Sequence, residues 1–207
     1  MISATDSTQH DRLRSALDSQ PIMRAFELRH LGIDATTISR AVERGDLVRV
    51  ARGLYQKSDG QVDGEQALAE ASRLVPKGVI AMLSALAYHG VTDQMPRKVW
   101  LAIGSKDWAP KVSYPPVHFV RLGANYLNQG IEHHMISGVS VPIYGVAKTL
   151  ADIFRHPKLI DRSMAIDSLR QTLTNRKATA AQIAEAAKSG RVWKTVQPYL
   201  EAMTSNG

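Results

Sequence analysis

Residues 23–56, MRAFELRHLGIDATTISRAVERGDLVRVARGLYQ, decide the fold of the first part of the chain. Apolar residues at helical intervals predict one helix over Met23–Leu31 and a second over Ala35–Arg44. Gly32 suits the end of the first helix, because the residue just past a helix often adopts a left-handed conformation. Two short strands are predicted next, joined by a turn over residues 51–53. Two helices with a tight turn between them, followed by a hairpin, predict a winged helix-turn-helix.

The outward face of the second helix is the predicted DNA-contacting surface. In a helix-turn-helix this helix lies in the major groove, and its apolar residues pack against the preceding helix. Arginine can bind a guanine edge or a phosphate through two donors, while a threonine in the first turn suits a phosphate. Arg52, at the tip of the hairpin, is expected to enter the minor groove. The predicted DNA-binding residues are Thr36, Thr37, Arg40 and Arg44 on the helix, with Arg49 and Arg52 in the wing.

The composition describes a folded, basic chain of 207 residues, of which 44% are hydrophobic. That is enough apolar material for a sizeable core, so global disorder is excluded. The 26 Lys and Arg residues exceed the 19 Asp and Glu residues, which favours a polyanionic partner. Cysteine is absent, which excludes disulfides, thiolate metal sites and a cysteine nucleophile.

The sequence contains no predicted membrane or export segment. The longest apolar stretch, Val79–Tyr88, is about half of the roughly 20 residues needed to cross a bilayer. The N-terminal segment MISATDSTQHDRLRS is polar and carries both charges, unlike a secretory signal. We therefore expect a cytoplasmic protein with no membrane partner.

The pattern of elements changes at Ser58–Gly60, where we place a domain boundary. Residues 1–60 form the predicted winged-helix domain, and in residues 61–207 helices precede and follow a small sheet. Predicted strands lie at 98–103, 117–122, 131–136 and 139–143. Predicted helices lie at 65–75, 79–89, 146–155, 160–173, 180–188 and 192–203. The expected fold class is α+β, an N-terminal winged helix-turn-helix domain followed by a mixed α/β C-terminal domain.

Several segments, taken in their order, carry a family resemblance. They are the turn Leu31-Gly32-Ile33, the wing at 47–55, the helix end SALAYHG at 84–90, the stretch PRKVWLAI at 96–103 and the helix VAKTLADIFR at 146–155. Through them the chain, over about residues 20–175, resembles the AbiEi antitoxins of type IV toxin–antitoxin systems. The resemblance implies a winged helix that represses its own operon by binding inverted repeats in double-stranded DNA, often cooperatively. It also implies a C-terminal domain that counteracts a nucleotidyltransferase-type toxin.

Some segments resemble catalytic or metal-binding motifs, but their spacing favours structural roles. His133 and His134 are neighbours on a predicted strand, so their side chains point to opposite faces, and no third ligand is spaced nearby. The loop 104–107 has a single carboxylate, whereas two-metal chemistry needs a pair. The junction 145–149 lacks the first glycine of a phosphate loop, and Asp152 beyond it is interpreted as a surface or capping charge. We expect no metal, no cofactor and no enzymatic activity.

The second domain carries most of the net charge. Residues 61–207 contain 17 basic and 11 acidic side chains, a net +6 of the total +7. This excess indicates a contact with nucleic acid, a positive face toward an acidic partner, or simply a solvated surface. The candidates for a basic partner face are Lys98, Lys106, Lys111, Arg121, Lys148, Arg155 and Lys158.

Two other functions remain open at the level of the sequence. The first is a stand-alone winged-helix regulator whose second domain binds a small molecule or forms a dimer. The second is a nucleic-acid-processing enzyme that the winged helix targets, although no cluster of metal-binding carboxylates supports it.

Overall fold

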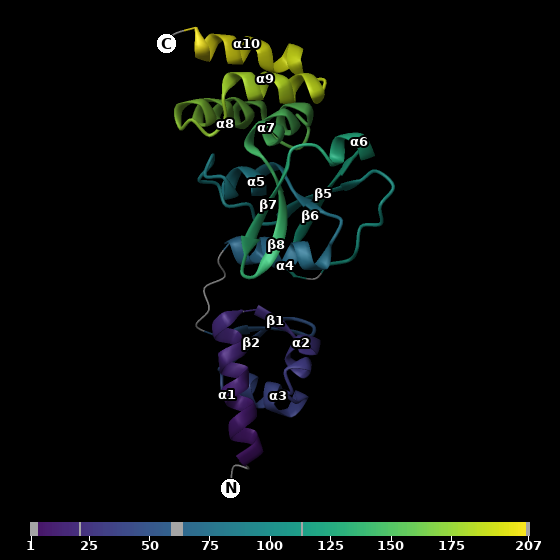
Figure 1. Cartoon of the computed structure of the whole chain (residues 1–207), viewed down its shortest axis with the longest axis vertical. Helices are drawn as coiled ribbons and strands as arrows, with labels where there is room; N and C mark the ends of the chain where they lie inside the picture. The colour runs from purple at the N-terminus through teal and green to yellow at the C-terminus, as the bar shows by residue number, and fades with distance from the viewer. Residues whose placement is uncertain (1–3, 21, 59–63, 113, 206–207) are drawn as a thin grey trace. The chain divides into compact units, whose positions relative to one another are not determined.

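The chain forms two compact units, residues 1–66 and 67–207 (Figure 1). The computed structural model describes residues 4–20, 22–58, 64–112 and 114–205. Every helix in these ranges is too short or too polar to cross a bilayer.

The N-terminal unit combines three helices with a three-stranded antiparallel sheet in the order β1-β3-β2. Leu28 of the second helix and Ile38 of the third are buried together with Leu13 and Leu17 of the first. The first helix therefore completes the core on which the other two pack. The elements are α1 (Ala4–Ser19), β1 (Ile22–Arg24), α2 (Ala25–His30), α3 (Ala35–Glu43), β2 (Leu47–Ala51) and β3 (Leu54–Lys57).

The predicted helix-turn-helix is confirmed. Gly32 between α2 and α3 adopts φ +74°, a conformation that side chains with a Cβ rarely adopt. The backbone N–H of Ile33 donates to the carbonyl of Leu28 at 3.1 Å, which ends α2. The tight turn thus follows from local sequence alone.

The first helix of the pair is shorter than predicted. Met23 lies in β1 rather than in a helix, and it is paired with Tyr55 of β3. Ile22 and Met23 are both buried, so these residues close the small sheet instead of extending α2. A strand of three residues is too short for its period to be recognised in the sequence.

The C-terminal unit is built on a five-stranded mixed sheet in the order β6-β5-β4-β8-β7. The pairs β5–β6 and β4–β8 are parallel, and the pairs β4–β5 and β7–β8 are antiparallel. The strands are β4 (Val79–Ile80), β5 (Val99–Gly104), β6 (Val117–Leu122), β7 (Ile131–Ile136) and β8 (Val139–Tyr144). The helices are α4 (Gly64–Leu74), whose first three residues precede the boundary between the units, α5 (Met82–Tyr88), α6 (Ala124–Leu127), α7 (Val146–Arg155), α8 (Arg162–Thr174), α9 (Ala180–Ser189) and α10 (Trp193–Thr204).

Helices cover both faces of this sheet. Alternate residues of β5 point to opposite faces, so Leu101 and Ala102 belong to different hydrophobic clusters. Leu68 and Ala71 of α4 lie in the cluster with Leu101, whereas apolar residues of α7–α10 surround the cluster with Ala102. Figure 1 shows α7–α10 stacked at one end of the unit.

The predicted helix over 79–89 begins later than expected. Val79 and Ile80 form β4, which lies between β5 and β8 in the middle of the sheet, and α5 starts only at Met82. Ile80 is completely buried. A short apolar run fits a central strand and a buried helix equally well, so only the pairing partners decide between them.

Candidate nucleic-acid interface

Helix α3 presents one polar row to the solvent. Ile38 and Ala41 are buried, whereas Thr36, Arg40 and Arg44 are exposed. Residues four apart lie on the same side of a helix, so these three side chains follow one another along α3. One hydroxyl and two guanidinium groups in a row match the acceptors on phosphates and guanine edges.

The outward orientation predicted for Thr37 is wrong. Its side chain is buried, and its Oγ1 donates to Oε1 of Gln9 in α1 at 2.8 Å. The same Gln9 oxygen accepts the backbone N–H of Asp34 at 3.1 Å, and Nε2 of Gln9 donates to the Asp34 carboxylate at 2.9 Å. Gln9 therefore holds the N-terminal end of α3 from a different helix. Nothing in the local sequence indicates this contact, because the partners lie 25 or more positions apart.

Gln9→Ala is expected to lower the free energy of unfolding of the N-terminal unit by about 1–2 kcal/mol, because the buried Thr37 hydroxyl loses its acceptor. Thermal denaturation followed by circular dichroism measures the loss. Ser15→Ala, at an exposed position of the same helix, is the matched control and should melt like the unmodified protein. Equal melting of the two variants would contradict the capping role of Gln9.

The hairpin β2–β3 forms the wing. Gly53 in its turn adopts φ +70°, a left-handed conformation that glycine adopts without steric cost. The pairing shifts register between Arg49 and Ala51, so the hairpin is irregular next to its tip. Arg49 and Arg52 are both exposed. The wing therefore presents two guanidinium groups from the strand and turn that follow α3.

Arg44 is held by an acidic neighbour. Its Nε donates to Oδ2 of Asp46 at 3.1 Å, and Nε2 of His10 lies 3.6 Å from the same carboxylate oxygen. The contact uses one of the five guanidinium donors, and both side chains are about half exposed. If Arg44 contacts DNA, it does so with a guanidinium group that also binds Asp46.

The segment that contains this geometry matches a known family. Residues 11–56 match the model described as "Transcriptional regulator, AbiEi antitoxin". Over these residues the N-terminal unit is similar to AbiEi-family regulators, and we refer to this unit as the AbiEi domain. The family resemblance seen in the sequence is thus confirmed over the helix-turn-helix and the wing. Within the AbiEi domain, the exposed face of α3 and the wing are the surfaces that suit DNA.

The chain as a whole shares its fold with a solved structure. The RV2827C protein from Mycobacterium tuberculosis matches with a TM-score of 0.61 at 16% identity, over 93% of this chain and 80% of that one. At this identity the likeness shows the fold alone. A comparison with curated proteins gives no match.

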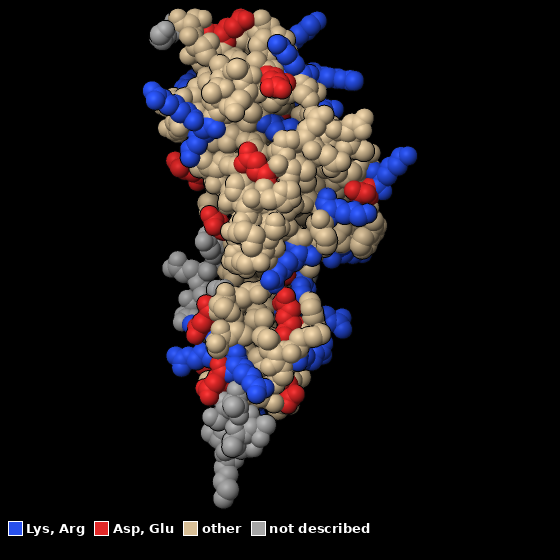
Figure 2. All heavy atoms as spheres, in the orientation of Figure 1, with Lys and Arg blue, Asp and Glu red and all other residues tan. Residues whose placement is uncertain are grey.

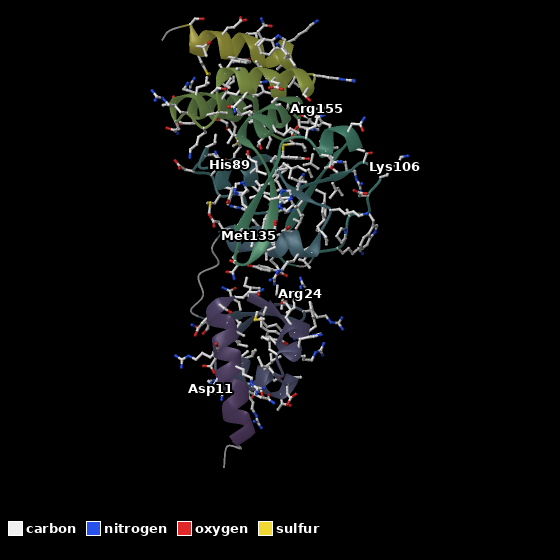
Figure 3. All side chains as sticks on the ribbon, viewed as in Figure 1. Asp11, Arg24, His89, Lys106, Met135 and Arg155 are labelled. Atoms are coloured by element: carbon white, nitrogen blue, oxygen red, sulfur yellow. The ribbon has the colours of Figure 1, made fainter. Side chains whose placement is uncertain are left out.

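Outside the AbiEi domain, the predicted basic partner face contains one buried residue. Lys148 has 6% of its surface exposed, so placing it on a partner face is wrong. The other six are exposed but come from different elements; Figure 3 shows Lys106 in the loop after β5 and Arg155 at the end of α7. Figure 2 shows Lys and Arg side chains spread over the visible face of this unit rather than gathered in one area. The exposed candidates are Lys98, Lys106, Lys111, Arg121, Arg155 and Lys158.

Arg121 has a structural contact of its own. Its Nη1 donates to the carbonyl oxygens of Gly104, Ser105 and Asp107 at 3.3, 3.2 and 2.7 Å. The carboxylate of Asp107 accepts the backbone N–H of Gly104 at 2.9 Å. The loop after β5 is thereby closed by its own residues and by β6, in agreement with its predicted structural role.

Lys148 forms a buried ion pair on the inward side of α7. Its Nζ lies 2.6 Å from Oδ2 of Asp152, and 3.7 and 4.1 Å from the ring centres of Tyr126 and Tyr144. Asp152 is fully buried, so its interpretation as a surface or capping charge is wrong. Burial lowers the pKa of Lys148, and the charge of Asp152 opposes this shift. Burial also raises the pKa of both tyrosines, so they stay neutral near pH 7.

The expectation that no third ligand lies near the two histidines is also wrong. His89 and Glu132 lie beside His134, whereas His133 is exposed and outside this group. Burial lowers the pKa of His89, while a hydrogen bond to the Tyr144 carbonyl acts in the opposite direction. Glu132 and His134 are two apart on β7, a spacing that places both on one face of a strand. The spacing of Glu132 and His134 is visible in the sequence. The position of His89 beside them depends on the tertiary structure.

Proposed function

We propose that the AbiEi domain represses the chain's own operon by binding inverted repeats in double-stranded DNA, and that the C-terminal unit counteracts a nucleotidyltransferase-type toxin. The exposed row on α3, followed by the basic wing, is the observation that carries the DNA-binding part. The family match supports the role of regulator, and autorepression and antitoxicity are what the family resemblance implies.

The exposed row on α3 and the wing suit different parts of the DNA. Arg40 lies in the middle of the row on α3, and its guanidinium group suits a guanine edge in the major groove. Thr36 lies in the first turn, where backbone N–H groups and its hydroxyl suit a phosphate. Arg49 and Arg52 in the wing suit phosphates or the minor groove, where guanidinium groups follow shape more than base identity.

Arg40→Ala is expected to weaken operator binding by about 1–3 kcal/mol and to relax specificity at the base that Arg40 contacts. Arg52→Ala should weaken binding about equally for all sequences and reduce the slope of affinity against salt by about one counterion. Fluorescence anisotropy at several salt concentrations, with the DNA upstream of the gene and with scrambled DNA, measures both effects.

The matched control for these variants is Arg170→Ala, which removes the same charge from an exposed position of α8. It should bind the operator like the unmodified chain. If Arg40→Ala and Arg52→Ala bind no worse than this control, α3 and the wing are not the DNA-binding surface.

The antitoxin part is tested in cells. The chain should restore growth when it is co-expressed with a nucleotidyltransferase-like protein encoded beside it. Six exposed basic residues of the predicted partner face are the candidate contacts with an acidic partner: Lys98, Lys106, Lys111, Arg121, Arg155 and Lys158. Normal repression without growth rescue would indicate a stand-alone regulator instead.

A further inference from the structure

We propose that His89, Glu132 and His134 bind a divalent first-row transition metal ion, for which zinc is the probe. His89 directly follows α5, while Glu132 and His134 lie on β7. One ligand atom from each of the three side chains lies within 4.8 Å of the other two. Figure 3 shows His89 where α5 ends, close to β7.

The donor set suits zinc. Two imidazoles and one carboxylate bind zinc in proteins when water fills the fourth position. Donor atoms about 2.0–2.2 Å from a tetrahedral ion lie roughly 3.3–3.6 Å from one another. Nε2 of His134 and Oε2 of Glu132 are 3.3 Å apart, which already meets this requirement. Both side chains are partly exposed, so small rotations can close the remaining distance to His89.

The surroundings prepare His89 to act as a ligand. Its Nε2 lies 2.9 Å from the carbonyl oxygen of Tyr144. A carbonyl oxygen only accepts, so Nε2 carries the proton and Nδ1 keeps a lone pair for the ion. Metal-binding histidines are commonly oriented by such a bond from the other ring nitrogen. The ring of Tyr88 packs against both imidazoles, with centres 5.4 Å from His89 and 4.9 Å from His134.

The cluster is accessible from solvent. His89 and Glu132 line a cavity of about 670 Å³, which gives an ion an entry path and leaves room for a water ligand. Lys177 lines the same cavity, and its positive charge opposes binding of a cation. Its side chain is exposed, however, so it can move away from the ion.

The test is a titration of the full-length chain with zinc after a chelator has removed bound metal, followed by calorimetry. A parallel titration with Co²⁺ reports the ligands through visible absorption. We expect one site per chain in the unmodified protein. His134→Ala and Glu132→Gln should each weaken zinc binding and the Co²⁺ absorption bands. Loss of a residue that only hydrogen-bonds to a metal ligand weakens binding by roughly 10–100-fold, so loss of a ligand itself should weaken zinc binding by more than that.

His133→Ala is the matched control, because it removes a neighbouring imidazole that points to the opposite face of β7. It should bind zinc like the unmodified chain. Circular dichroism of the metal-free variants checks that each is folded. If His134→Ala does not fold, Glu132→Gln tests the proposal. Absence of zinc binding, equal losses in His133→Ala and His134→Ala, or unchanged binding in every variant would overturn the proposal.

Discussion

Asp152→Ala is expected to destabilise the C-terminal unit by about 3 kcal/mol, the lower end of what is found when one partner of a buried ion pair is removed. The substitution leaves the ammonium group of Lys148 buried without its counter-charge. The tyrosine rings on which this group packs offset part of the loss, because a cation is attracted to the face of an aromatic ring. Urea denaturation measures the change in the free energy of unfolding.

Two controls separate the effect of burying the ion pair from the effect of losing a charge. Asp167→Ala breaks a pair with Arg170 on α8 that has a similar spacing but is exposed, so stability should hardly change. The double variant Lys148→Met with Asp152→Leu removes both charges and should recover most of the stability, because apolar residues of similar size replace buried ion pairs well. If the two single variants, Asp152→Ala and Asp167→Ala, lost equal stability, burial would not make the Lys148–Asp152 pair more important for stability than an exposed pair.

Deleting residues 1–60 is expected to lower operator affinity by at least about 10³-fold, to the level of non-specific binding, because the deletion removes α3 and the wing. The remaining chain should still fold cooperatively, since α4 begins at Gly64 and the sheet has its own two hydrophobic clusters. Leu13, Leu17 and Tyr55 all pack in the core that the deletion removes. Anisotropy with operator DNA and a circular dichroism melt measure the two outcomes.

The same fragment tests where antitoxicity lies. On the proposed function, residues 61–207 should retain some rescue of cells that express the toxin, whereas residues 1–60 should rescue nothing. A fragment that melts cooperatively but gives no rescue would contradict an antitoxin activity contained in the C-terminal unit alone. Operator binding by the fragment at the affinity of the full chain would contradict the assignment of DNA recognition to the AbiEi domain.

The sequence predicted the elements whose signals are local. The helix-turn-helix was recognisable because its periodic apolar residues and Gly32 lie within one short segment. The hairpin was recognisable for the same reason, with Gly53 supplying the left-handed turn residue. The short strands β1 and β4 were missed because two or three residues have no readable period. Their place is set by pairing with strands far away in the chain.

By itself, then, the sequence determined the winged helix and the row of Thr36, Arg40 and Arg44 on its second helix, since a helical period fixes which residues share a side. Only the tertiary structure decided which polar groups are buried. Thr37 turns inward because Gln9 of another helix offers it an acceptor. Lys148 and Asp152 face the core because α7 is packed there, and His89 reaches β7 because α5 ends beside it. The contacts of Thr37 with Gln9 and of His89 with β7 join residues distant in sequence, and such contacts leave no period in the chain.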